Sequence, residues 1–249
     1  MLSACVTTSD SNFARKADPS VAAEKYVQLG LEYIKRNELI RARKHLKRAL
    51  QLDPQHAAAH AALGLIYHED AENKLAEKSF KQAIEIDPTY TRGRTYYGAF
   101  LFSQERFQEA LEQFQLASED TGYASRDQVF TNIALCHLKL GNNAQALEAY
   151  EKTLRLDRFN GRALAGATEL LIEQDDFQRA QNYYNRLVRL IAQQGMKHSP
   201  QSLWMGIRIA RYYGSVAQEE SLSTLLAELY PQSAEYRAYK KLRSKGYYQ

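Results

Sequence analysis

Residues 57–90 read AAAHAALGLIYHEDAENKLAEKSFKQAIEIDPTY, and the landmarks of this stretch return at a fixed interval on both sides of it. Small residues recur every 34 residues in two columns, which are Gly30, Gly64 and Gly98, and Ala42, Ala76 and Ala110. Large residues keep the same step, in the columns Leu29, Leu63 and Tyr97, then Tyr33, Tyr67 and Leu101, then Leu46, Phe80 and Phe114. A fixed period of this length predicts a stack of similar structural units, each a pair of helices.

Each column has a physical reason. A glycine or alanine lets the two helices of one hairpin cross closely, and the larger residues fill the remaining gaps between neighbouring hairpins. Asp53-Pro54 and Asp87-Pro88 close two of the units, because proline cannot continue a helix and disfavours helical geometry at the residue before it. This is the pattern of the tetratricopeptide repeat (TPR), in which a large apolar residue, a Leu-Gly pair, a tyrosine, small residues and a proline recur every 34 residues. The sequence therefore predicts an all-α fold, a TPR superhelical solenoid of about six helix-turn-helix repeats plus a C-terminal cap helix.

The register also predicts the domain plan. It continues through Ala146 and Ala180, with two extra residues inserted near 120–123. We expect a leader over 1–22 and a single TPR domain over 23–245. The predicted repeats span about 23–56, 57–90, 91–126, 127–160, 161–194 and a degenerate 200–232, followed by a cap helix over 233–245.

Composition limits the partners. The net charge of +4 over 249 residues is modest and gives no sign of nucleic-acid binding. No stretch approaches the roughly 20 apolar residues that span a bilayer. Basic residues cluster over 35–48 and 240–245, and two interpretations remain open. They are either solvated helix faces or contacts to an anionic membrane surface or an acidic partner.

The N-terminus contains a candidate lipidation site. Leu2-Ser3-Ala4-Cys5 followed by a polar stretch resembles a bacterial lipobox, in which the cysteine is acylated and becomes the mature N-terminus. If Cys5 is a lipobox cysteine, the resemblance to lipoproteins implies sorting to the outer membrane rather than the inner membrane, because Val6 and not an aspartate follows it. Only four residues precede Cys5, so we expect the charged and apolar parts of a signal peptide to lie upstream of Met1. The alternative is an accidental match in a leader segment.

Catalysis is not expected. His56, His60 and His68 fall on one predicted helix, but His56 lacks the glutamate of an H-E-x-x-H site, and His60 occupies a packing column. There is no glycine-rich phosphate loop and no G-x-S-x-G motif. Cys136 lies among apolar residues and is expected to be a small buried hydrophobe. We therefore expect no enzyme activity, no metal and no cofactor.

The first hairpin carries the predicted partner-binding site. Val27, Leu31 and Ile34 form an apolar stripe at i, i+4 and i+7 on a hairpin that no earlier repeat covers. With Leu65 of the second repeat they would form an apolar groove, and exposed apolar patches mark interaction sites. Alternatively, residues 9–22 fold back and cover the stripe.

Taken together, these features are similar to the TPR pilotins of type IV pilus systems, a family of pilus-assembly lipoproteins. The lipobox, the six hairpins and the length all resemble the family. Two less generic stretches also resemble the family. One is Ala117-Ser118-Glu119-Asp120-Thr121, which leads into residues 129–132, and the other consists of residues 206–210 and 229–236.

The resemblance implies a non-enzymatic assembly factor on the periplasmic face of the outer membrane, anchored by a lipid on Cys5. It implies binding to the outer-membrane secretin subunit of the pilus and promotion of its localisation and multimerisation. Two alternatives stay open at this point. One is a periplasmic TPR scaffold or adaptor lipoprotein for another cell-envelope complex, and the other is a cytosolic chaperone adaptor.

Overall fold

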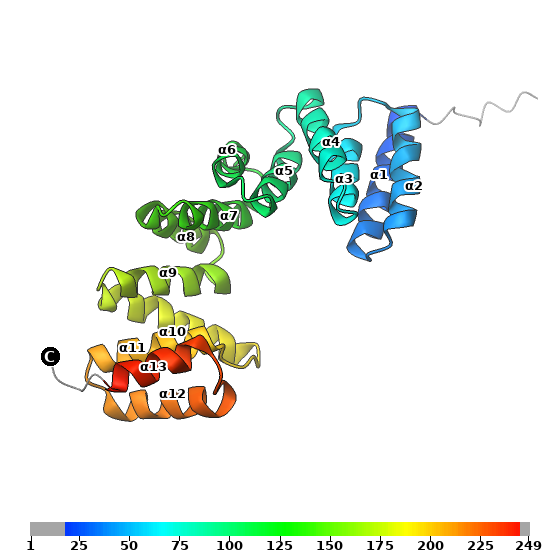
Figure 1. Ribbon diagram of the computed structural model, residues 1–249. Helices are drawn as coiled ribbons and strands as arrows, with labels where there is room; N and C mark the ends of the chain where they lie inside the picture. The colour runs from blue at the N-terminus through cyan, green and yellow to red at the C-terminus, as the bar shows by residue number, and fades with distance from the viewer. Residues whose placement is uncertain (1–17, 245–249) are drawn as a thin grey trace, which may run out of the picture. The chain divides into compact units, whose positions relative to one another are not determined.

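A computed structural model describes residues 18–244, and every regular element within this range is an α-helix (Figure 1). The helices in chain order are α1 (Pro19–Lys35), α2 (Leu39–Leu52), α3 (Ala57–Glu69), α4 (Asn73–Ile86), α5 (Thr91–Ser103), α6 (Phe107–Ser118), α7 (Arg126–Lys139), α8 (Asn143–Leu156), α9 (Gly161–Glu173), α10 (Phe177–Gln193), α11 (Pro200–Tyr212), α12 (Val216–Leu229) and α13 (Ala234–Ser244).

The chain divides into two compact units, Met1–Phe100 and Leu101–Gln249, and the division falls within α5. In the first unit α1 packs against α2, and α3 packs against α4. In the second unit α7 packs against α8, α9 against α10, and α11 against α12. Each of these pairs is a hairpin of consecutive helices, so the predicted all-α TPR architecture is confirmed.

The glycine columns mark the closest approach within a hairpin. A Cβ atom on Gly30 would lie 2.7 Å from the side chain of Leu46, and one on Gly64 would lie 2.6 Å from the ring of Phe80. Leu46 and Phe80 are themselves fully buried. The 34-residue period therefore repeats a contact in which one helix has no side chain and the facing helix has a large one.

A second column, which the sequence analysis did not identify, lies at the turn inside each hairpin. One residue has a left-handed backbone in six of the turns between successive helices: Asn37, Ala71, Glu105, Gly141, Asp175 and Gly214, with φ values of 59°, 61°, 60°, 78°, 58° and 67°. Gly141 and Gly214 adopt this conformation without steric cost, and Asn37 and Asp175 tolerate it better than most residues. Packing of the flanking helices thus imposes the turn on Ala71 and Glu105, which do not favour it.

Aspartates end three of the second helices. The Oδ1 atoms of Asp53, Asp87 and Asp157 accept hydrogen bonds from the backbone N–H two residues later, at 3.0, 2.8 and 2.9 Å. Such an Asx turn stabilises the chain reversal whether or not proline follows. This explains why Asp157 closes its repeat without the proline that follows Asp53 and Asp87.

The first helix begins earlier than the predicted domain boundary. Asp18 caps α1 by accepting a hydrogen bond from the backbone N–H of Ser20 at 3.0 Å, and Pro19 occupies the first helical turn. Residues 19–22, which the sequence assigned to the leader, therefore belong to the first helix. Cys5 and the remaining leader lie outside the described residues.

The C-terminal helix covers the end of the last hairpin. Tyr239 of α13 is buried in a cluster with Leu203, Ile207 and Leu226, and Tyr236 packs against the same cluster. The Tyr230 hydroxyl donates a 2.6 Å hydrogen bond to the carbonyl of His198, which joins the end of α12 to the loop before α11. The two tyrosines of α13 thus lie on its packed side.

Candidate partner-binding surfaces

The predicted apolar stripe of the first hairpin is only partly a surface. Val27 is 1% exposed and lies in a buried cluster with Ala23, Leu46 and Ile66, among others. The expectation that Val27 lies exposed in a groove is therefore wrong. The reason is that α1 packs against α3 as well as α2, so a position unused within the hairpin is covered by the next hairpin.

The other three residues of the predicted site keep accessible surface. Leu31 and Ile34 are half-buried and pack against the same cluster as Val27, and Leu65 lies half-buried on α3. A side chain in this position is held by the core on one side and reaches solvent on the other. Leu31, Ile34 and Leu65 are called the first-hairpin site below.

Three histidines of the first unit each contact a different group, and they do not converge on one site. His56 Nε2 lies 3.2 Å from Glu24 Oε2, which links α3 to α1, and His60 Nε2 lies 3.0 Å from the carbonyl of Pro54. The His68 ring meets Phe100 edge to face, with 5.4 Å between ring centroids. No group of three or more metal-ligating side chains exists among residues 18–244.

Two adjoining cavities lie in the second unit. A cavity of about 610 Å³ lies between α7, α8, α9 and α11, and a smaller one of about 260 Å³ lies between α7 and α9. Arg162 lines both of them. On α7, Gln128 and Thr131 line the smaller cavity, and Leu138 lines the larger.

Glu169 is the principal charged group in the larger cavity. Its Oε1 accepts a 2.8 Å hydrogen bond from Arg208 Nη1, but its Oε2 is buried without a hydrogen-bond partner among the described residues. Burial raises the pKa of this carboxyl; Arg208 lowers it in part, and Glu173 raises it further. Sequence reasoning missed this pair, because the two residues are 39 positions apart. The only signal was a glutamate within an otherwise apolar helical stretch.

Cys136 is fully buried in α7, as predicted. Burial raises the pKa of its thiol to about 12. The thiolate is the nucleophilic form of cysteine, so this side chain acts as a small hydrophobe and not as a reactive group.

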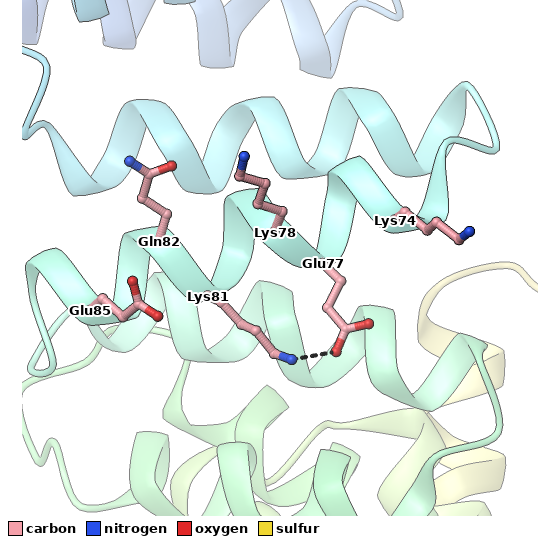
Figure 2. A pocket seen from close by; sticks show the side chains of 6 residues that line it. All are labelled: Lys74, Glu77, Lys78, Lys81, Gln82 and Glu85. Carbon is pink, nitrogen blue, oxygen red and sulfur yellow. Dashed lines mark ion pairs between the residues drawn. The ribbon is translucent and has the colours of Figure 1, made fainter.

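The outer surface of α4 holds an open cavity of about 580 Å³ lined by side chains of that helix (Figure 2). The lining residues are Lys74, Glu77, Lys78, Lys81, Gln82 and Glu85. Lys81 Nζ and Glu77 Oε1 form an ion pair at 3.0 Å, which the dashed line in Figure 2 marks. The two signs of charge are mixed on this face, as is usual for a solvated helix surface.

Comparison with known proteins first defines the class. Tetratricopeptide-repeat family profiles match residues 30–70, 57–90 and 131–194. The crystal structure of PilW, a widely conserved type IV pilus biogenesis factor, has the same fold, with a TM-score of 0.69, 22% identity and coverage of 87% of this chain and 97% of PilW. The chain is thus an all-α TPR protein, which is consistent with a role in protein interaction rather than catalysis.

A second comparison defines the family. The type IV pilus assembly protein PilF of Pseudomonas aeruginosa is 36% identical over 240 residues, which cover 96% of this chain and 93% of PilF. The solved structure of PilF superposes with a TM-score of 0.81 at 34% identity, covering 90% of this chain and 98% of the PilF chain. The chain belongs to the family of TPR proteins of type IV pilus biogenesis.

Among the helices within residues 18–244, none combines the length and the apolar character that a membrane crossing requires.

Proposed function

We propose that this protein is an outer-membrane lipoprotein that acts as the pilotin of a type IV pilus. It binds the secretin subunit and promotes the localisation of that subunit to the outer membrane and its multimerisation there. The observation that carries the proposal is the 36% identity to PilF, which extends over 96% of the chain. A match over this share of the chain extends beyond the repeats that the 34-residue columns define.

In this proposal, a lipid on Cys5 anchors the protein in the outer membrane. Acylation of its thiol and of the new N-terminus would give more than one acyl chain, which provides stable anchoring where a single chain does not. The protein would then lie on the periplasmic face of the outer membrane, where secretin subunits arrive. This assignment is supported by the lipobox-like Leu2-Ser3-Ala4-Cys5.

The first-hairpin site supplies the secretin contact. Leu31, Ile34 and Leu65 would bind apolar side chains of a secretin segment, while Val27 holds α1 in place from within the core. Half-buried side chains suit this role, because the core fixes their positions before the partner arrives. Binding then orders few groups, which limits its entropic cost.

The function is tested by deleting the gene and measuring secretin multimers in isolated outer membranes. Loss of multimers, restored by the wild-type gene, supports the proposal, and normal multimers in the deletion strain contradict it. Complementation with Cys5→Ser separates the anchor from the binding site. If Cys5 is the anchor, this variant leaves the membrane fraction and restores few multimers. Mass spectrometry of the protein from the complete gene then identifies the acyl groups.

The binding site is tested with two matched substitutions on α1. Leu31→Glu introduces a charge at the first-hairpin site, and Leu29→Glu introduces the same charge at a side chain that is 45% exposed. We expect Leu31→Glu to abolish secretin binding and Leu29→Glu to retain it. Leu65→Glu repeats the test from α3, and circular dichroism verifies that each variant is folded. Full binding by folded Leu31→Glu and Leu65→Glu would exclude this site.

A further inference from the structure

The second helix has an unusual charge distribution. It carries five arginines and lysines and no aspartate or glutamate in its 14 residues, LIRARKHLKRALQL. Its apolar side faces the core through Ala42, Leu46 and Ala49, so the basic residues lie on the outer side. Positive charges placed this close together repel one another and destabilise the helix unless carboxylates or a bound anion neutralise them.

Carboxylates compensate only the first turns of α2. Arg41 Nη1 forms an ion pair with Glu38 Oε2 at 2.6 Å, and Arg43 pairs with Asp70. Lys44 and Lys47 are exposed and form no ion pair with any residue in the range 18–244. Arg48 is also exposed, and its Nη1 donates a 2.9 Å hydrogen bond to the neutral side chain of Gln51. Three neighbouring cations thus remain without a compensating charge.

These cations surround a concavity. A cavity of about 580 Å³ is lined by Tyr26, Lys44, His45, Lys47, Arg48 and Gln51. The His45 ring is stacked with Tyr26 and Tyr33, at centroid distances of 5.9 and 5.3 Å, which fixes one wall. Ammonium and guanidinium groups around a concave surface are the donors that bind phosphate groups.

The next repeat provides an internal comparison. A shift of 34 residues places the α4 cavity of Figure 2 on the corresponding face of the second hairpin. There Glu77 replaces Arg43, Gln82 replaces Arg48 and Glu85 replaces Gln51. Positions 40, 43, 44, 47, 48 and 51 carry a net charge of +4, and their counterparts carry +1 in α4 and −2 in α6 with its C-terminal cap residue Glu119. The excess of positive charge is therefore a property of the first hairpin and not of the repeat.

We propose that Lys44, Lys47 and Arg48 form a docking surface for anionic phospholipid headgroups, which holds the first hairpin against a membrane surface. The charge is complementary to lipid phosphates, and Ile40, next to the basic face, is 89% exposed and available to the interfacial region. Thirteen peptide steps separate Cys5 from Asp18, a reach of at most about 45 Å, so an anchor at Cys5 keeps this helix near the bilayer. The choice of a membrane as the source of the anion rests on the proposed function.

The test uses the full chain carrying Cys5→Ser, which cannot be acylated, so that binding through the helix is measured without the anchor. Sedimentation with vesicles compares phosphatidylglycerol–phosphatidylcholine mixtures with pure phosphatidylcholine at low ionic strength. We compare Lys44→Gln/Lys47→Gln/Arg48→Gln with the control Lys74→Gln/Lys78→Gln/Lys81→Gln. Both variants lose three positive charges, and both leave the buried face of their helix unchanged.

We expect wild-type protein to bind the anionic vesicles and not the neutral ones. The α2 variant should bind on the order of 100-fold more weakly, since each basic residue near an anionic surface contributes about a fivefold factor. The α4 variant should bind within about threefold of wild type, and added salt should weaken binding in every case.

Three outcomes would overturn the proposal. One is no preference of wild-type protein for anionic vesicles, and another is an equal loss in the two variants, which would reflect net charge alone. The third is α2-dependent binding to a polyglutamate peptide without binding to vesicles, which would identify an acidic protein segment as the occupant. None of these outcomes affects the proposed function, which the secretin multimer assay decides separately.

Discussion

Gly64 of α3 faces the ring of Phe80 of α4 so closely that a Cβ atom on the glycine would lie 2.6 Å from the ring. Phe80 is fully buried, so the ring has no solvent to move into. The absence of a side chain at Gly64 is therefore a condition for the packing of the second hairpin.

Gly64→Ala should destabilise the protein by up to about 2 kcal/mol. Overpacking of a well-packed interior costs about 1–3 kcal/mol, and this exceeds the gain of about 1 kcal/mol in helix propensity. Urea unfolding followed by circular dichroism measures the change. Gly161→Ala is the control, because a Cβ there would lie 3.4 Å from Leu190, an ordinary contact. Equal stabilities of the two variants would contradict the packing account.

Ala71→Gly should stabilise the protein by about 0.5–1 kcal/mol. Ala71 has φ of 61° in the turn between α3 and α4, and an alanine pays a steric cost in the left-handed region that a glycine avoids. Thermal unfolding measures the shift. The same substitution at Ala238, an exposed residue inside α13, should lower stability by up to about 1 kcal/mol. A loss of stability at both positions would exclude strain at Ala71.

Glu169 should make stability depend on pH. Burial raises the pKa of this carboxyl above its ordinary value of 4.5, so the folded state favours the protonated form. The favourable contribution of the Glu169 carboxyl to the free energy of unfolding is complete at pH values below its ordinary pKa. This contribution is lost as the pH rises through the raised pKa of the folded state. Because glutamine resembles the protonated acid, Glu169→Gln should gain stability relative to wild type between pH 4 and pH 7. Urea unfolding across this range measures the difference.

Glu148→Gln is the control of opposite sign. Lys152, at 2.7 Å, lowers the pKa of Glu148, so the contribution of this carboxylate is present above its ordinary pKa and is lost as the pH falls. The effect should be small, because the Glu148 side chain is 63% exposed. A pH-independent difference between Glu169→Gln and wild type would refute the assignment for Glu169.

The thiol of Cys136 should resist modification in the folded protein. Its pKa of about 12 and its complete burial leave almost no accessible thiolate at pH 8. In a Cys5→Ser background, Cys136 is the remaining cysteine, and iodoacetamide labelling followed by mass spectrometry reports on it alone. We expect labelling in urea and little in buffer. Rapid labelling of the native protein would show that α7 opens readily or that Cys136 is accessible.

The sequence predicted hairpin packing better than it predicted surfaces. Gly30 and Gly64 could be assigned from the 34-residue period, because close helix crossing admits few residue types. Val27 was assigned to the surface because the period distinguishes positions used within a hairpin from the rest. The period does not show which of the positions unused within a hairpin are covered by the following hairpin. In the structure, α3 of the second hairpin covers Val27.

The turn column and the charged pair could not be predicted for a different reason. Ala71 and Glu105 are not typical of a left-handed turn, so their sequence carries no signal for it. Glu169 and Arg208 come from α9 and α11, the first helices of two neighbouring hairpins, and ordinary glutamates and arginines occur throughout the chain. Only the packing of these two helices brings the pair into one cavity.

The sequence by itself determined the all-α TPR fold, the approximate limits of the hairpins and the family resemblance, because these depend on local helix geometry that repeats every 34 residues. The tertiary structure decided which apolar residues stay accessible, where a carboxylate is left half-satisfied and which cations of α2 form no ion pair with a carboxylate within residues 18–244. These properties depend on contacts between residues far apart in the sequence, such as Arg43 with Asp70, and a periodic pattern does not encode them.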